Sequence, residues 1–136
     1  MRILTCLSVL SLFFTLSVQS AETGPVPVFL RLTRGERSIR IPFYRHEGLL
    51  MNDLCRNDLT NCKAFRKTKT EPAPKAGDLA QKTTVSNPAD VFCKRTGGVL
   101  LILTDEAAHQ IGICAFDDKT LVSAWGAYRN AERHPK

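Results

Sequence analysis

The sequence lacks the residue patterns by which most enzymes and metal proteins are recognised. It contains no Gly-rich phosphate loop, no nucleophile elbow and no zinc-binding motif. Its histidines, His46, His109 and His134, lie in different segments, and none stands at metal-ligand spacing from another histidine or a cysteine. We therefore expect a non-enzymatic protein with no catalytic residues, no cofactor and no metal.

Long apolar segments are also scarce. The one pronounced run lies in residues 1–20, after Arg2 and before Ala21. A charged start, a short apolar core and small residues at the end are typical of a secretory signal peptide, and the run is too short for a membrane span of about 20 apolar residues. We expect cleavage near Ser20/Ala21, a periplasmic or secreted chain and no stable membrane insertion. Because no long amphipathic basic helix follows, membrane lysis is the least favoured function.

Acidic residues are fewer than basic ones, 13 against 19. The first twenty residues hold one arginine and no acid, so the rest carries 18 − 13 = +5. In an exported protein this charge argues against nucleic acid as a partner and favours an anionic surface or polymer. The alternative is an excess of Lys and Arg that serves only solubility.

Four cysteines follow residue 20, namely Cys55, Cys62, Cys93 and Cys114. In an oxidising compartment an even number predicts two disulfides, with three connectivities open. In an unbroken helix, Cys55 and Cys62 would lie about 10.5 Å apart, beyond the Cα separation of about 4.4–6.8 Å that a disulfide tolerates. Either the chain breaks between them or each has another partner.

The middle of the chain changes character at Arg66. Residues 66–85 are poor in large apolar groups and rich in Lys, Thr, Pro and Ala. Such a composition cannot bury enough surface to offset the entropy of ordering, so we predict a flexible linker between two units, residues 21–65 and 86–136.

The N-terminal unit contains two alternating apolar and polar segments around Leu30–Leu32 and Ile39–Phe43, which predict a β-hairpin with a loop at residues 33–38. Residues 49–65 are expected to be helical or turn-like. The hairpin is rich in arginines, which we expect to gather on one solvent side or in the loop and to form a candidate anion-binding surface. They are Arg31, Arg34, Arg37, Arg40 and Arg45.

The C-terminal unit opens with a short helix, in which Asn87 is a capping residue, Pro88 fits the first turn and Gly97-Gly98 ends the helix. Residues 99–104 and 111–116 predict a second hairpin. If the helix packs over the face that carries Gly112 and Cys114, Cys93 can meet Cys114. The loop of about twenty residues so closed would stabilise the fold by about 3 kcal/mol.

The last segment, residues 121–134, predicts a helix in which Leu121, Trp125 and Tyr128 form a core-facing stripe. The predicted class is therefore α+β: a small disulfide-stabilised C-terminal unit of helix, β-hairpin and helix, preceded by a β-hairpin plus helix/turn unit.

Four motifs of the C-terminal unit, NPADVFC, TGG, IGICAF and WGAYR, resemble a bacterial exported domain of unknown function, number 333, often labelled haemolysin. The resemblance covers about residues 86–132, and the family has no settled activity. Similar family members usually carry two further cysteines at the places of Val122 and Glu132. Their joint absence implies that Cys93–Cys114 remains as one bridge and that Cys55 pairs with Cys62.

We expect an exported binding protein of the bacterial envelope or secretome with an unidentified protein partner. Its candidate binding loop joins the strands of the second hairpin and contains Asp105, Glu106 and His109. A fold-level likeness to potato-inhibitor-type protease inhibitors suggests an inhibitor-like module. The alternative is an envelope protein that contacts an anionic surface polymer through the arginine-rich hairpin. The sequence predicts neither the identity of the partner nor the oligomeric state.

Overall fold

The computed structural model of the chain describes residues 24–75, 77 and 87–134. The expected signal peptide, residues 1–20, lies outside the described residues, as do residues 76 and 78–85 of the expected linker.

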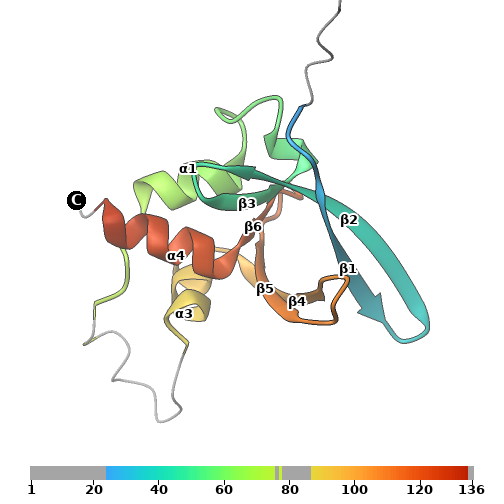
Figure 1. The fold of residues 1–136 in the computed structure, drawn as a ribbon. Helices are drawn as coiled ribbons and strands as arrows, with labels where there is room; N and C mark the ends of the chain where they lie inside the picture. The colour runs from blue at the N-terminus through green and yellow to red at the C-terminus, as the bar shows by residue number, and fades with distance from the viewer. Residues whose placement is uncertain (1–23, 76, 78–86, 135–136) are drawn as a thin grey trace, which may run out of the picture.

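Six strands form one closed antiparallel barrel in the order β1-β2-β3-β6-β5-β4 (Figure 1). The α+β class predicted from the sequence is confirmed. The elements in chain order are β1 (Val28–Arg34), β2 (Arg37–His46), β3 (Leu49–Asn52), the 3-10 helix η1 (Asp53–Cys55), α1 (Lys63–Thr70), α3 (Pro88–Arg95), β4 (Val99–Thr104), β5 (Gln110–Ala115), β6 (Leu121–Ser123) and α4 (Ala124–Arg133).

Apolar side chains form two cores because side chains of a strand alternate between its two faces. One core fills the barrel and contains Leu30, Phe43, Leu50, Leu103 and Ile113. The other lies between the strands and the helices, which cover one side of the barrel (Figure 1). Its buried members include Leu49, Met51, Phe92, Cys114 and Val122. The four residues of β3 are all buried because the strand separates the two cores.

The structure differs from the expected division of the chain into two units. β1 pairs with β4 at Arg31 and Thr104, and β3 pairs with β6 at Met51 and Val122. Strands from both expected units therefore close one barrel. The reason is that neither hairpin can bury its apolar face alone, and each supplies the surface that the other covers.

Three local expectations also differ from the structure. Residues 49–52 form β3 where helix or turn was expected, and residues 121–123 form β6 where helix was expected. The linker boundary expected at Arg66 falls inside α1. In each case contacts with residues distant in the chain determine the local structure.

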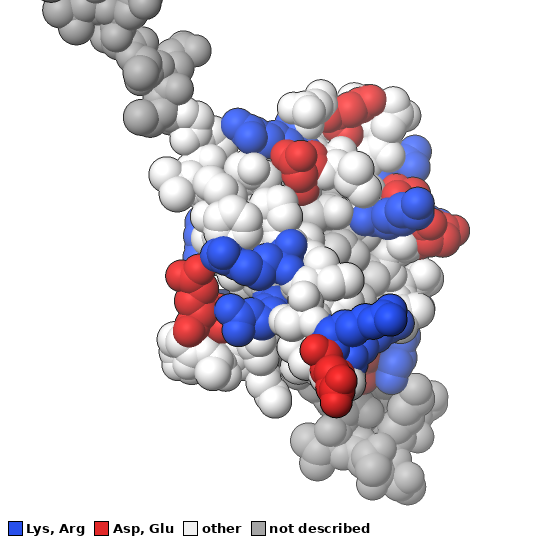
Figure 2. All heavy atoms as spheres, turned by 90° about the vertical axis from the view of Figure 1, so that its right-hand side faces the viewer, with Lys and Arg blue, Asp and Glu red and all other residues white. Residues whose placement is uncertain are grey.

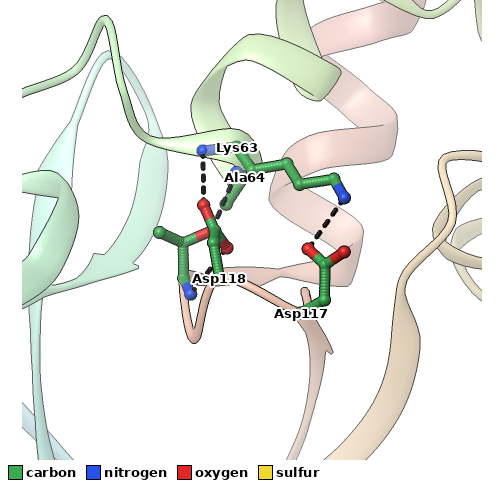
Figure 3. Close-up of polar contacts among 5 residues, drawn as sticks. Lys63, Ala64, Asp117 and Asp118 are labelled. Atoms are coloured by element: carbon green, nitrogen blue, oxygen red, sulfur yellow. Dashed lines mark hydrogen bonds and ion pairs between the residues drawn. The ribbon is translucent and has the colours of Figure 1, made fainter.

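The start of α1 shows such contacts (Figure 3). The backbone amide of Lys63 donates to Asp118 Oδ2 at 3.0 Å, and that of Ala64 donates to Thr120 Oγ1 at 3.0 Å. The amide of Phe65 donates to Cys62 Sγ at 3.2 Å. Side chains thus satisfy three of the first amides of α1, which lack partners within the helix. Lys63 Nζ also donates to Asp117 Oδ1 at 2.7 Å, so the turn before β6 holds α1 in place.

Helix α3 has the predicted ends. The Asn87 side chain accepts from the Ala89 amide at 2.9 Å, Pro88 occupies the first turn, and Gly97 is left-handed with φ 83°. Gly98 has a different role, because a Cβ at this position would overlap Cys114 Sγ and lie 3.1 Å from Cys93 Sγ. The disulfide therefore packs directly on the backbone that follows the helix.

Both disulfides are formed. Cys93 pairs with Cys114, with a Cα separation of 5.6 Å, and fastens α3 to β5. Cys55 pairs with Cys62, with a Cα separation of 5.0 Å. The chain breaks its helix between the latter two, as this pairing requires: η1 ends at Cys55 and α1 begins at Lys63.

Trp125 is not the core residue that the helical stripe predicted, since 42 % of its surface is exposed. Because α4 begins only at Ala124, its buried face carries the small residues Ala124, Ala127 and Ala131. Trp125 lies beside this face, edge-on to Tyr128, with their ring centroids 5.7 Å apart. Among the described residues, none of the helices is long and apolar enough to cross a membrane.

Candidate functional site

The predicted arginine-rich segment forms a long two-stranded hairpin, β1 and β2, which we call the arginine hairpin (residues 28–46). Its turn contains only Gly35 and Glu36, with Gly35 left-handed at φ 58°. A glycine at this position makes a two-residue hairpin turn accessible at no steric cost. The hairpin extends away from the helices (Figure 1).

The strand register places four of the five candidate arginines in two cross-strand pairs. Arg31 lies opposite Arg40, and Arg34 lies opposite Arg37. The four do not share one side, because a strand reverses its face at each residue, but Arg34 and Arg37 lie within the loop expected at residues 33–38. Arg31 and Arg40 lie on the outer face, whereas Arg34 and Arg37 flank the turn on the face that carries Leu32 and Ile39.

These arginines are exposed and mostly unneutralised. Among the residues that the structure describes, Arg31, Arg34 and Arg37 have no acidic partner. Over residues 28–46 the chain carries five arginines and one glutamate, a formal balance of 5 − 1 = +4. Figure 2 views the side from which the hairpin projects and shows basic side chains spread across it, with acidic groups beside several of them.

Arg40 is the one member of the set with defined partners. Its guanidinium lies 4.5 Å from the ring centroid of Phe29 and donates to Glu106 Oε1 at 2.8 Å. The side chains of Arg40 and Glu106 are 55 % and 74 % exposed, so the pair contributes at most about 1 kcal/mol. An anion can therefore replace the Glu106 carboxylate without a large loss of stability.

The candidate binding loop, residues 105–109, lies next to the arginine hairpin through this ion pair. The Asp105 carboxylate accepts from the amides of Ala107 and His109, each at 2.9 Å, and lies 3.0 Å from His109 Nδ1. The hydrogen bonds from the backbone amide and the ring of His109 lower the pKa of Asp105. Ala108 is left-handed, with φ 64°. The loop is thus a closed turn whose polar groups bond mainly to one another.

The three histidines lie in different elements: His46 ends β2, His109 is in the loop and His134 follows α4. The hydrogen bond and charge of Lys69 lower the pKa of Glu47, and the charges of His46 and His134 add to this effect. Within residues 24–75, 77 and 87–134, no three groups of His, Cys, Asp or Glu are placed to hold a metal ion.

Sequence reasoning found the arginines and the loop but missed Phe29 and the pairing of Glu106 with Arg40. The position of Phe29 was readable, since it lies two residues before Arg31 and shares its face in a strand. The Arg40–Glu106 contact was not readable, because it joins residues 66 positions apart.

Comparison with known proteins finds a similar family for one part of the chain. Residues 84–131 match the family model described as "Domain of unknown function (DUF333)". No curated protein and no solved structure matches the chain. The match includes α3, the strands β4–β6 and most of α4, but not the arginine hairpin. It confirms the domain resemblance predicted for the C-terminal residues: the segment 84–131 is similar to this domain of unknown function.

Proposed function

We propose that the protein is an exported, non-enzymatic binding protein of the bacterial envelope or secretome, and that the arginine hairpin contacts an anionic surface polymer. The observation that carries this proposal is the strand register, which places Arg31 opposite Arg40 and Arg34 opposite Arg37. Like charges placed directly opposite each other destabilise a sheet. Glu106 neutralises Arg40, and an anion bound to the other arginines would explain an arrangement that otherwise costs stability.

A polymer with repeated charges fits this surface better than a single small anion. The two arginine pairs are three residues apart along the strand, or about 10 Å at about 3.3 Å per residue. They also lie on opposite faces of the hairpin. A flexible polyanion can follow the projecting hairpin and contact both pairs, whereas one small anion reaches only one of them.

The protease-inhibitor-like function has less support. It would use residues 105–109 as an exposed loop that enters a protease cleft. The Asp105 carboxylate closes this loop with bonds to the amides of Ala107 and His109, and Ala108 is left-handed. A substrate-like loop requires extended backbone over several residues, so the arginine hairpin is the stronger candidate.

The two disulfides are the basis for proposing a compartment. Both disulfides are almost fully buried and join segments that the fold needs, and such bonds persist in oxidising compartments. This supports export to the periplasm or the exterior. A signal peptide in residues 1–20 is the proposed route.

The test uses inorganic polyphosphate as the polyanion. The protein is used in the form in which the cell exports it. Fluorescence anisotropy should show saturable binding that weakens steeply as ionic strength rises from about 0.01 to about 0.15 M, because salt screens exposed charges. The Arg34→Gln/Arg37→Gln variant should bind more weakly. Its slope of log affinity against log salt should be lower by about one for each lost contact, as for phosphate contacts to nucleic acids.

The matched control is Arg66→Gln/Arg133→Gln, which removes the same charge from exposed positions on α1 and α4. If it weakens binding as much as the hairpin variant, only net charge matters and the hairpin is not the site. A third variant, Glu106→Gln, frees Arg40 and should strengthen binding about two- to threefold. An unchanged or weaker affinity in this variant would contradict a role for Arg40.

A further inference from the structure

A pocket of about 270 Å³ lies where the end of β2 meets β3 and η1, away from the turn of the arginine hairpin. Residues of the core under the helices and of the segment after η1 line it. Those that matter for recognition are Tyr44, Met51, Cys55, Arg56 and Leu59. None of the lining residues is acidic.

Arg56 is the basic residue of this pocket that can face a ligand. Arg56 lies over the ring of Tyr44, with its Cζ atom 4.5 Å from the ring centroid. This contact uses the flat face of the guanidinium and leaves its edge, which carries the N–H donors, for another group. Within the described ranges Arg56 has no acidic partner. Its N–H donors are therefore not used by a carboxylate of the described residues.

The floor of the pocket is apolar and fixed. Met51 is 3 % exposed and Cys55 is fully buried. The neighbouring Asn52 offers little to a ligand, because its Oδ1 accepts from the Leu121 amide and its Nδ2 donates to the Lys119 carbonyl, both at 3.0 Å. The disulfide of Cys55 with Cys62 holds the segment that contributes Arg56 and Leu59. A rigid apolar floor beside a guanidinium group that has no acidic partner among the described residues is the chemistry of a site for an amphiphilic anion.

We propose that this pocket binds a carboxylate attached to an apolar group, such as an aryl or branched aliphatic side chain. The carboxylate pairs with Arg56, which Tyr44 orients for it. The apolar group covers Met51, Cys55 and Leu59. Arginine suits this role because its planar fork matches the two oxygens of a carboxylate. The volume is close to the lower end of small-molecule sites, about 300 Å³, which restricts the ligand to one ring or one side chain.

This site is separate from the polyanion surface proposed above. The pocket uses Arg56, whereas the polyanion surface uses Arg31, Arg34, Arg37 and Arg40. The two proposals can therefore fail independently.

The first experiment titrates the full chain with phenylacetate and with the neutral analogue phenylacetamide, followed by heteronuclear NMR. Phenylacetate should saturate and shift the amide signals of residues 44–59, and phenylacetamide should bind at least tenfold more weakly. Arg56→Gln should weaken phenylacetate binding at least tenfold. The matched control Arg37→Gln, which removes the same charge from the hairpin, should leave it unchanged.

A second variant blocks the pocket without removing a charge. A Cβ at Gly24 would lie 3.1 Å from Arg56 Nη2, so the larger side chain of Gly24→Leu must displace the guanidinium. This variant should also lose phenylacetate binding, while polyphosphate binding stays unchanged. Equal binding of phenylacetate and phenylacetamide, shifts outside residues 44–59, or wild-type affinity in both Arg56→Gln and Gly24→Leu would overturn the proposal.

A carboxylate attached to an apolar group can belong to a free small molecule or to the C-terminus of a peptide that ends in an apolar residue. A short peptide ending in phenylalanine and its C-terminal amide distinguish them. If the free-acid peptide binds at least tenfold tighter than phenylacetate and the amide does not bind, the ligand is a peptide C-terminus. If phenylacetate binds tighter, the ligand is a free small carboxylate. If the amide binds as well as the acid, the carboxylate is not recognised and the proposal fails.

Discussion

Strands β5 and β2 belong to the same barrel, yet their outward faces differ. β5 carries Gly112 and Cys114 under the helices, where the disulfide to Cys93 fastens α3. The hairpin end of β2 carries Arg40 on its outward face, opposite Arg31, and Arg37 beside the turn on its other face, opposite Arg34. The difference teaches that one half of the barrel holds the contacts that stabilise the fold, while the other half presents charge. Substitutions in the first half should therefore change stability, and those in the second should change binding.

The largest loss of stability should come from removing the disulfide between α3 and β5. We expect Cys93→Ala/Cys114→Ala to lower the free energy of unfolding by about 3 kcal/mol, because the unfolded chain regains the freedom of a loop of about twenty residues. Urea unfolding followed by circular dichroism measures this change. A loss below about 1 kcal/mol would show that packing alone holds α3 on the sheet.

The contact between the disulfide and the backbone after α3 should be the next most sensitive. Gly98→Ala should cost about 2 kcal/mol, because its Cβ would overlap Cys114 Sγ and the core must shift. Gly97→Ala, at a left-handed position with open space around it, should cost only about 1 kcal/mol of backbone strain. Thermal unfolding compares the two variants. Equal costs would indicate that steric contact with the disulfide is unimportant.

The contact that joins the two halves of the chain at α1 should have a smaller effect. Thr120 is 4 % exposed, and its hydroxyl accepts from the Ala64 amide. Thr120→Val keeps the shape but leaves that amide without a partner, so we expect a loss of about 1–2 kcal/mol. Hydrogen exchange of the first turn of α1 should accelerate as well. Unchanged exchange would mean that Asp118 and Cys62 suffice to cap the helix.

The turn before β6, which carries Asp118 and Thr120, should make the stability of the protein depend on pH in acid. Burial raises the pKa of Asp118, but hydrogen bonds from the Thr120 hydroxyl and amide and from the Lys63 amide outweigh it and lower the pKa below the usual 3.8. A carboxyl group with a lowered folded-state pKa stabilises the fold above 3.8, and this contribution is lost as pH falls through the folded value. Asp118→Asn should therefore reduce stability at neutral pH and make it less dependent on pH below about 4. Unfolding curves measured at several acidic pH values would contradict this if the two proteins lose stability in parallel.

The smallest effect on stability is expected in the hairpin and has the opposite sign. Arg34→Gln/Arg37→Gln removes one like-charge pair and should raise the free energy of unfolding by a few tenths of a kcal/mol. The gain should shrink at high salt, because exposed charges are screened. Arg66→Gln/Arg133→Gln is again the control. A clear loss of stability would mean that the arginines support the fold.

The local features of the fold were predictable from the sequence, and the closure of the barrel was not. The ends of α3 follow from Asn87, Pro88 and Gly97, which act within one turn of the helix. The part of α1 beyond Phe65 was not predicted, because two capping groups of the helix, Asp118 and Thr120, lie 55 and 56 positions away from the amides that they accept from. No window of local sequence contains that information.

The candidate site, too, was predictable from the sequence only in part. The arginines are visible as residue types, but their arrangement in pairs depends on the exact register, which follows from the turn at Gly35 and Glu36. A loop of six residues was expected there, and the shorter turn brings Arg34 and Arg37 face to face. The pocket of Tyr44 and Arg56 was not predictable, because it requires β3 at residues where helix or turn was expected.

The two cross-links have one further consequence. Each joins cysteines on the same side of the segment between Lys75 and Asn87, 55 with 62 and 93 with 114, so among the described residues no covalent bridge connects the two sides. Only strand pairing, side-chain packing and polar contacts such as those of Asp118 and Thr120 hold them together. A molecule nicked at an engineered protease site between these residues should therefore migrate as one particle in gel filtration and as two fragments in denaturing electrophoresis without reductant. Two separately produced fragments should likewise reassemble, which makes the chain a natural scaffold for split-protein complementation.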